Sequence, residues 1–331
     1  MSEGGANGRA HALVAHLRTS LAAPALDLAE EPRALLGGFD SEIYALRLRH
    51  APPALAGPLV LRVLRTAHEP ARAEREAATQ NALADLGYPV PRVLVACVDP
   101  GALGAPFVVM ERVAGRPLFE VGLRAMPATL ARLQLRLHAL DPAPVARALG
   151  EAGTFDGYLL RMGRRIERAD LAGLAGVLAW LHRARPGDGP AAVCHGDFHP
   201  QNILVEAGAV TGVLDWSNAL VADPAFDVAS TLDIVRFAPV HLMPLSRARR
   251  GLAALAQPLL ARRYLAAYRR ARPIDGARLA YYEVAAALRA LVRAGENRRQ
   301  PSASSDLDAS SYAARLLQRT RRLTGVDATL P

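Results

Sequence analysis

The sequence contains no lysine, so arginine supplies all forty of its basic residues. Cysteine is also scarce: Cys97 and Cys194 are too few for a disulfide framework or a thiolate zinc site, and we expect both to be reduced. The chain has no uncharged apolar run of about eighteen residues, and its first residues do not join a basic segment to a long apolar one. These absences predict a cytoplasmic protein without a membrane span or a signal peptide.

Aromatic residues make up only 5% of the 331 residues, which bears on how the net charge of +9 is interpreted. A basic chain raises the question of nucleic-acid binding, but base-stacking surfaces need aromatic side chains interleaved with the cations. Here the arginines are scattered along the chain rather than collected in one arm. We therefore expect neither a nucleic acid nor a membrane as a partner. The apolar share of 51% suffices for one large domain or two lobes.

The first part of the chain contains strand-like runs, and the second part is mostly helical. Runs of β-forming residues between turn signals stand at 33–38, 41–48, 58–65, 91–98 and 106–113, and one helix-forming stretch, 69–87, interrupts them. Helical periodicity then dominates at 126–140, 157–184, 224–236, 249–272, 276–296 and 307–323, while strand-like sequence returns only at 193–215. We predict an α+β fold with a helical extension (1–30), a small sheet lobe with one main helix (31–113) and a larger helical lobe (114–331).

The segment 191–205, AAVCHGDFHPQNILV, places polar residues inside an otherwise apolar, strand-like run. One interpretation is a polar turn between two strands, because Asp, His, Pro and Asn are common turn residues. A second takes His195, Asp197 and His199 as alternate residues on one strand face that bind zinc or iron. Against it, the other histidines are isolated in the sequence and supply no further clustered ligands.

A third interpretation of the same segment is phosphoryl transfer. That chemistry needs a carboxylate to receive the proton of the acceptor hydroxyl, and oxygen ligands that hold magnesium on the nucleotide phosphates. Asp197, Asn202 five residues later, and Asp215 on a following hairpin supply these groups. Their spacing matches the kinase catalytic loop and its downstream metal-binding aspartate.

Two motifs, HGDFHPQN at 195–202 and VLDWSNALVADPAFDVA at 213–229, together resemble those of the aminoglycoside phosphotransferase and choline kinase family. This family is the small-molecule branch of the protein-kinase-like fold. The resemblance extends from about residue 31 to near the end of the sequence and is weakest after 240. It implies a bilobal protein-kinase-like fold, with a small antiparallel sheet lobe and a larger, mostly helical lobe.

The resemblance also implies roles for the residues of the loop. Asp197 would be the catalytic base that orients and deprotonates the acceptor hydroxyl, and Asn202 and Asp215 would bind Mg2+. His199 stands where protein kinases often have a lysine near the transferred phosphate, so we expect of it either a phosphate contact or a structural hydrogen bond. Asp227 resembles the aspartate that braces the catalytic loop.

Three neighbouring residues have sufficient structural explanations. Trp216 takes the place of the kinase phenylalanine, and we expect it in the core. Asp223 and Pro224 suit the N-cap and the first position of a helix.

Phosphate-binding residues are expected in the sheet lobe. Gly38 and Ser41 lie in a turn where backbone N–H groups can approach phosphates, although a plain hairpin turn has the same composition. Arg62 stands on the third strand where the family usually has a lysine that contacts the α and β phosphates. The following helix offers Glu74 and Glu76 as partners for this cation, and the family pattern favours Glu76.

The run PFVVMERVAG resembles the hinge between the two lobes of the family. By that analogy Met110 guards the adenine pocket. The carbonyl of Glu111 and the amide of Val113 would then hydrogen-bond the base.

Together these features predict an enzyme that uses Mg2+ to transfer the γ-phosphoryl group of ATP or GTP to a hydroxyl of a small molecule. A catalytically silent nucleotide-binding or regulatory protein of the same fold is the alternative, motivated by Arg62 in place of lysine, and the metallohydrolase is a minor one. From residue 225 onward, eighteen arginines stand against eight acidic residues. We therefore expect a neutral, weakly charged or anionic acceptor rather than a polycationic aminoglycoside.

Overall fold

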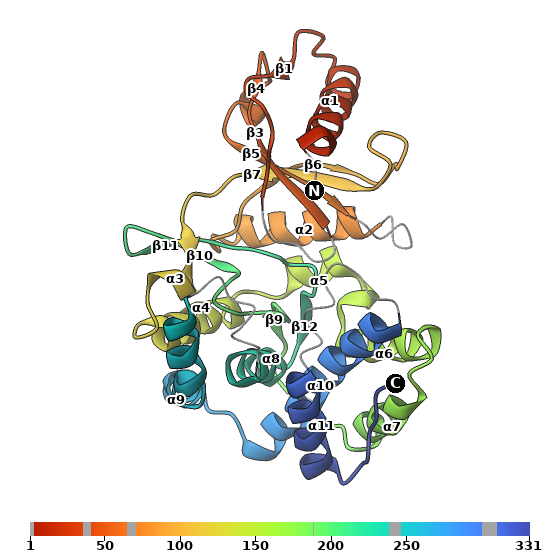
Figure 1. Cartoon of the computed structure of the whole chain (residues 1–331), viewed down its shortest axis with the longest axis vertical. Helices are drawn as coiled ribbons and strands as arrows, with labels where there is room; N and C mark the ends of the chain where they lie inside the picture. Colours follow the sequence, from red (N-terminus) through yellow and green to blue (C-terminus); the bar gives the residue numbers. More distant parts are fainter. Residues whose placement is uncertain (1–2, 36–40, 65–70, 188, 238–245, 300–309) are drawn as a thin grey trace. The chain divides into compact units, whose positions relative to one another are not determined.

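The computed structural model of the chain describes residues 3–35, 41–64, 71–187, 189–237, 246–299 and 310–331 (Figure 1). Its described residues form two compact units. The first comprises 1–115 and 204–217, and the second comprises 116–203 and 218–331. The segment 204–217 thus packs with the first unit, although it lies in the part of the sequence expected to form the second lobe.

An antiparallel sheet is the framework of the first unit, with the strand order β2-β3-β5-β7-β6. Its strands are β2 (Arg33–Ala34), β3 (Ser41–Leu46), β5 (Leu59–Leu64), β6 (Val93–Cys97) and β7 (Phe107–Glu111). Two short strands, β1 (Asp27–Leu28) and β4 (Leu48–Arg49), pair separately, and η1 (Pro53–Leu55) is a 3-10 turn. Each strand of the sheet lies inside one of the strand-like runs of the sequence, which confirms the predicted small antiparallel sheet.

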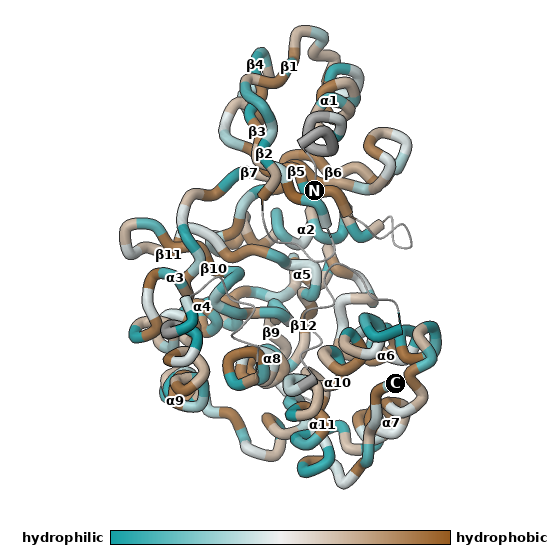
Figure 2. The backbone as a smooth tube through the Cα atoms, viewed as in Figure 1, coloured by the Kyte–Doolittle hydropathy of each residue, from teal (hydrophilic) through white to brown (hydrophobic). Residues whose placement is uncertain are grey.

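The two helices of the first unit cover opposite faces of this sheet. On β5, Leu61 and Val63 belong to the core cluster that includes α1 (Glu3–Ser20), whereas Val60 and Leu64 belong to the cluster that includes α2 (Arg72–Asp85). Figure 2 shows the hydrophobic residues along β5 to β7 that supply these clusters. Because side chains alternate along a strand, Arg62 shares the face of Val60 and Leu64 and is directed toward α2.

A hairpin of β10 (Ile203–Glu206) and β11 (Ala209–Val213) also packs in the first unit. Its two-residue turn is Ala207–Gly208, both with positive φ (48° and 81°), the combination that fits the twist of paired strands. Backbone Val213 N donates to Pro89 O at 2.7 Å, which ties the end of β11 to the loop that follows α2. The hairpin therefore fixes the position of the backbone just before Asp215.

The second unit is mostly helical. Its helices are α3 (Leu118–Val121), α4 (Met126–His138), α5 (Ala143–Leu149), α6 (Phe155–Arg168), α7 (Ala175–Arg183), α8 (Pro224–Phe237), α9 (Arg247–Ala271), α10 (Gly276–Arg299) and α11 (Ser310–Thr324), with 3-10 turns η2 (Glu151–Gly153) and η3 (Ala172–Leu174). Its strands are β8 (Arg116–Pro117), β9 (Ala192–Cys194) and β12 (Leu220–Ala222).

The pairing of β9 with β12 brings two distant segments together. Cys194 pairs with Leu220 and Ala192 with Ala222 in antiparallel register. β9 leads into the segment that begins at His195, and β12 leads into α8. Ala225 N donates to Asp223 Oδ1 at 2.8 Å, which confirms the predicted helix start.

One predicted helix is divided in the structure. The stretch expected as a single helix over 157–184 forms α6 and α7, with η3 between them. Asp170 has φ of 50°, a left-handed conformation that an α-helix cannot continue through. α5, which follows Pro142, was not predicted from the periodicity.

Within the ranges described by the structure, no helix is long and apolar enough to cross a membrane. Both cysteines are free thiols, as expected. Cys194 is buried at the end of β9, and burial raises the pKa of its thiol well above the ordinary value. This thiol is therefore protonated at neutral pH and acts as a small core residue.

α1 is predicted to be part of the folded core of the first unit rather than a detachable extension. Leu17 is fully buried in the cluster that joins α1 to the sheet, so Leu17→Ala should lower the free energy of unfolding by about 2–5 kcal/mol. Leu21→Ala makes the same change at a side chain that is 39% exposed and serves as the control. Equal midpoints of urea denaturation for the two variants would show that α1 does not contribute to the core.

Candidate active site

Arg62 is held by three side chains of the first unit. Its Nη1 donates to Glu76 Oε1, its Nε to Ser41 Oγ at 3.1 Å, and its Nη2 to Asp215 Oδ1 at 3.3 Å. The Arg62 side chain is 10% exposed, so these contacts replace most of its hydration. The expected ion pair between Arg62 and Glu76 is therefore present, and the same cation also reaches the candidate metal ligand.

Glu76 depends on this cation because it is buried. Burial raises the pKa of the Glu76 carboxyl above its usual value, and the charge of Arg62 opposes that rise. Glu76 Oε2 has no hydrogen-bond partner among the described residues. The planar guanidinium donates in several directions at once, which a lysine ammonium on one stem cannot reproduce with the same geometry.

Asp215 projects from a strained turn just after β11. Its φ is 63°, in the left-handed region that aspartate tolerates better than most residues. Ser217 Oγ donates to Asp215 Oδ1 at 2.8 Å, and the Asp215 side chain is 37% exposed. The next residue, Trp216, is buried as expected, and its Nε1 donates to Val213 O at 3.0 Å. The turn thus holds the Trp216 indole in the core and leaves the Asp215 carboxylate partly exposed.

The candidate hinge residues lie at and after the end of β7. Met110 is buried on the face that packs with α2, and Gln80 Nε2 lies 3.8 Å from its Sδ. Glu111 N donates to Arg92 O at 2.9 Å, so this backbone amide is committed within the sheet. Val113 is half-buried, and its side chain packs against Gly212 of β11. Gly38, a candidate phosphate-binding residue, lies outside the described residues.

The segment after β9 is shaped by Gly196. This residue has φ of 75°, and a Cβ atom there would lie 2.3 Å from Asn218 O, so only glycine fits without displacement. His195 is buried, and its Nδ1 accepts a hydrogen bond from Asp197 N at 3.2 Å. The backbone therefore turns sharply between a buried histidine and the candidate base.

Asp197, His199 and Asn202 are brought together within this loop. Asn202 Nδ2 donates to the backbone carbonyl of Asp197 at 3.1 Å and lies 3.2 Å from His199 Nε2. His199 Nε2 lies 3.9 Å from Asp197 Oδ2. The Asp197 side chain is 20% exposed, so its carboxylate is accessible at the surface of the second unit.

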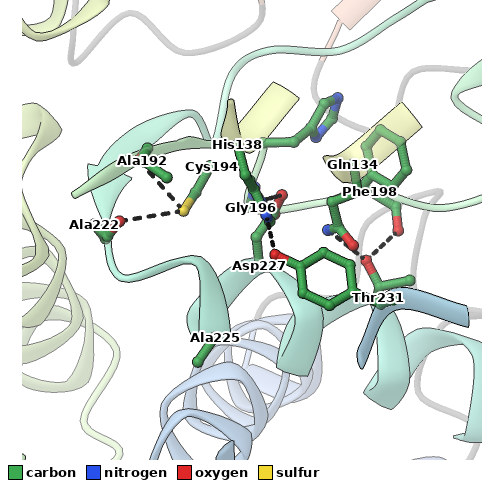
Figure 3. A network of polar contacts seen from close by, with 12 residues as sticks. Gln134, His138, Ala192, Cys194, Gly196, Phe198, Ala222, Ala225, Asp227 and Thr231 are labelled. Atoms are coloured by element: carbon green, nitrogen blue, oxygen red, sulfur yellow. Dashed lines mark hydrogen bonds and ion pairs between the residues drawn. The ribbon is translucent and has the colours of Figure 1, made fainter. Parts of the chain in front are cut away.

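A buried network beneath the loop holds it in place (Figure 3). Asp227 of α8 accepts from Gly196 N through Oδ1 at 2.7 Å, and its Oδ2 lies 3.1 Å from His138 Nε2. Thr231 Oγ1 donates to Phe198 O at 2.9 Å and accepts from Gln134 Nε2 at 3.2 Å. The bracing contact expected of Asp227 is present, but sequence reasoning missed the parts played by His138, Gln134 and Thr231.

The charge state of Asp227 follows from the same contacts. Burial favours the neutral acid, but the hydrogen bond and charge of His138 outweigh it and lower the pKa of the Asp227 carboxyl. His138 Nδ1 in turn lies 2.6 Å from the Tyr268 hydroxyl, so the network extends to α9. An ionised carboxylate thus binds the loop backbone with a charge-assisted hydrogen bond.

Each unit offers an oxygen donor on its own. In the first, Asp215 has a partly exposed carboxylate. In the second, Asn202 donates through its amide nitrogen to the Asp197 carbonyl, so its amide oxygen is not used in that contact. Oxygen ligands of this kind suit magnesium. Among the described residues, no group of three or more His, Cys, Asp or Glu side chains can hold a metal ion together. This gives no support to the zinc or iron site on His195, Asp197 and His199.

Arg289 of α10 is a site residue that the motifs did not identify. Its Nη2 donates to Asp197 Oδ1 at 3.2 Å, across 92 residues of sequence. The only signal available was that Glu283 and Arg289 are the charged residues in the apolar stretch 279–292. Glu283 accepts from Arg236 Nη1 at 2.8 Å and from Arg319 Nε at 2.9 Å, so it has a structural explanation, whereas Arg289 points to the candidate base.

Comparison with known proteins gives a family match over most of the chain. Residues 31–274 match the family described as "Phosphotransferase enzyme family". Over 173 residues the chain is 31% identical to mouse acyl-CoA dehydrogenase family member 10, covering 47% of this chain and 16% of that protein. Over 157 residues it is 34% identical to the aminoglycoside 3'-phosphotransferase of Streptomyces fradiae, covering 43% of this chain and 57% of that enzyme. The chain thus spans only part of these relatives.

Solved structures share the fold. Aminoglycoside phosphotransferase APH(4)-Ia, in a ternary complex with ADP and hygromycin B, superposes with a TM-score of 0.62 and 18% identity over 96% of this chain and 99% of that one. At this identity the likeness establishes the fold alone. It confirms the protein-kinase-like architecture predicted from the sequence.

The Asp227 network is predicted to be the main support of the loop. Asp227→Ala leaves Gly196 N and His138 without their buried partner and should lower the free energy of unfolding by about 3–5 kcal/mol. Because the folded-state pKa of Asp227 is lowered, its contribution is present above the unfolded value of about 3.9 and is lost as the pH falls below it. Asp327→Ala, at a side chain that is 74% exposed, is the control. Equal free energies of unfolding for the two variants, measured by chemical denaturation at pH 7, would contradict the assignment.

Proposed function

The chain belongs to the phosphotransferase enzyme family, and from that membership we propose that it transfers the γ-phosphoryl group of ATP or GTP to a hydroxyl of a small molecule. The observation that carries the proposal is the arrangement of Asp197 and Asn202 in one braced loop, with an accessible carboxylate and an oriented amide. Phosphoryl transfer asks a protein mainly for such positioning and for electrostatic stabilisation.

In this proposal Asp197 is the base. Its carboxylate accepts the proton of the acceptor hydroxyl as the oxygen attacks phosphorus, and ADP or GDP leaves. The backbone on which Asp197 stands is fixed from below by the Asp227 contact to Gly196, so little reorganisation is needed when the acceptor binds. His199 has its Nδ1 within 3.3 Å of Gln201 N and its Nε2 near Asn202, which supports its structural role; a contact with the transferred phosphate is the additional proposal.

We propose Asn202 and Asp215 as the protein ligands of Mg2+, which supplies charge neutralisation on the nucleotide phosphates when it is bound. The oxygen donor set supports this assignment. Asp215 contacts Arg62 Nη2 and Ser217 Oγ through the same oxygen, Oδ1. These contacts orient the Asp215 carboxylate before a metal ion binds.

Nucleotide binding is proposed for the first unit, and it rests on the family resemblance. Arg62 would contact the α and β phosphates while Glu76 keeps the guanidinium in place. Backbone N–H groups near Gly38 and Ser41 would approach the phosphates. The Ser41 hydroxyl is itself engaged by Arg62, so it supports the cation rather than the nucleotide. The adenine or guanine base would lie against Met110 and hydrogen-bond the backbone of Glu111 and Val113.

The silent alternative gains no specific support, because Arg62 pairs with Glu76 as the corresponding lysine pairs with a helix glutamate in active protein kinases. The acceptors of related enzymes, such as the hygromycin B in the APH(4)-Ia complex, do not identify the acceptor here. For this chain we propose a neutral, weakly charged or anionic hydroxyl compound, on the excess of arginine after residue 225.

Loss of the base is predicted to abolish transfer without abolishing nucleotide binding. Asp197→Asn removes the proton acceptor and should lower kcat by about a hundredfold to ten-thousandfold, while the affinity for ATP changes little. Transfer is measured as gain of one phosphoryl group by compounds of a metabolite extract, followed by mass spectrometry. Asp156→Asn, at an exposed side chain of the same unit, is the control. Near-native transfer by Asp197→Asn would exclude this role, and no transfer by the native chain with any acceptor would favour the silent alternative.

Magnesium dependence is predicted to pass through Asp215. Asp215→Ala should abolish the increase in ATP affinity that Mg2+ produces, because a hard cation bridging phosphates needs this carboxylate. EDTA should have the same effect on the native protein. Asp85→Ala, an exposed residue of α2, is the matched control. Calorimetric titration of ATP with and without Mg2+ tests it, and an undiminished magnesium effect in Asp215→Ala would place the cation on other ligands.

A further inference from the structure

A cation stands beside the candidate base where the proposed function does not require one. Arg289 Nη2 donates to Asp197 Oδ1 at 3.2 Å, and the two side chains are 18% and 20% exposed. Both belong to the second unit, whereas the cation proposed for the nucleotide phosphates, Arg62, belongs to the first. Arg289 therefore lies beside the carboxylate that would receive the acceptor proton.

Support of the loop does not explain this arginine. The loop around Asp197 is already held by the contacts of Asp227 with Gly196 and of Asn202 with the Asp197 carbonyl. The contact between Arg289 and Asp197 is therefore not needed to hold the backbone of the loop.

Neutralisation of a second buried acid does not explain it either. Asp233 of α8 lies near Arg289, but neither of its carboxylate oxygens has a hydrogen-bond partner among the described residues. Burial and the nearby Glu283 raise the pKa of Asp233 well above its usual value, which favours the neutral acid. Among the described residues, Arg289 forms an ion pair with Asp197.

A second guanidinium belongs to the neighbourhood of the pair. Tyr312 of α11 lies within the electrostatic reach of Arg289, Asp197 and a second arginine, Arg293, one turn further along α10. A polyamine acceptor would bring its ammonium groups against these two guanidinium groups. An anionic group beside the reacting hydroxyl would instead meet them with opposite charge.

We propose that Arg289 binds an anionic group of the acceptor, a carboxylate or a phosphate ester, a few carbon atoms away from the hydroxyl that is phosphorylated. This inference rests on the proposed function, since it takes Asp197 as the group that faces the acceptor hydroxyl. The guanidinium has five N–H donors, of which one contacts Asp197, so it can bind the acceptor anion while it retains that contact. Arg289 is then the residue that selects the acceptor by charge, and it holds the hydroxyl close to the base.

The test compares hydroxyl compounds of different charge. The full chain, with magnesium and ATP, is given glycolate and 3-hydroxypropanoate against their primary amides, glucose 6-phosphate against glucose, and kanamycin as a polycation. In the native protein we expect kcat/KM for the anionic member of the preferred pair to exceed that of the neutral one by about 10–100-fold, the effect of one charge-assisted hydrogen bond. The hydroxy acids and the sugar phosphate separate carboxylate from phosphate recognition.

The ratio within a pair is the decisive readout because both members use the same base. Arg289→Gln should bring the ratio near one, and Arg289→Lys should retain part of it. Arg299→Gln, an exposed arginine of the same helix, should leave the ratio unchanged. Equal loss of activity with both members would mean that Arg289 acts on Asp197 or on the transferred phosphoryl group, and it would overturn the inference. Preference for glucose, an amide or kanamycin in the native protein would also overturn it.

Equilibrium binding separates this inference from the proposed function. The same compounds are titrated calorimetrically into the native protein and Arg289→Gln without nucleotide. Binding of an anionic member that Arg289→Gln loses supports the anion site, even if none of the compounds is phosphorylated. In that case the failure would belong to the proposed reaction or its acceptors. Absence of charge-dependent binding together with absence of charge-dependent turnover rejects the inference.

Discussion

The second unit is organised around one buried carboxylate that must remain charged. Asp227 is fully buried, yet the hydrogen bond that it accepts from Gly196 N and its contact with His138 keep it ionised. A carboxylate in that environment is tolerated only where its partners are fixed. The backbone of the loop, the helix α4 that carries His138 and the helix α8 that carries Asp227 are therefore constrained together. The part of the loop that carries Asp197 lies at the surface of the second unit and is supported by this buried network.

In the first unit the charge that is held by close partners is a cation, Arg62. Arg62 is surrounded by Ser41, Glu76 and Asp215, and the strand alternation that turns Leu61 toward α1 turns Arg62 toward α2. Because Glu76 lacks a partner for its second oxygen among the described residues, the pair is electrostatically incomplete, and Arg62 is its main compensating charge. In both units a buried charge is stabilised by a few close partners. One of these partners belongs to a sequence motif in each case: Gly196 beside Asp227, and Asp215 beside Arg62.

Sequence reasoning succeeded where the determinants are local. Asp197 and Asn202 are five residues apart in one loop, the N-cap Asp223 contacts residues two and three positions later, and the alternation on β5 fixes the face of Arg62. It failed where tertiary packing selects the partner. Nothing near Asp197 in the sequence identifies Arg289, since it lies 92 residues away on α10, a helix that packs against α8. The helix break at Asp170 was missed for another reason: a single residue in the left-handed conformation leaves no periodicity signal.

The absence of lysine has a chemical consequence at the nucleotide site that we propose around Arg62. A guanidinium does not lose its proton in proteins, so Arg62 never offers the neutral, nucleophilic nitrogen that a lysine amine reaches by deprotonation. Nucleotide analogues that carry an acyl phosphate acylate such an amine when they bind beside it. Beside Arg62 such analogues would bind and dissociate without acylating the side chain. A chemical survey of nucleotide sites that relies on amine acylation would therefore not detect the proposed site at Arg62.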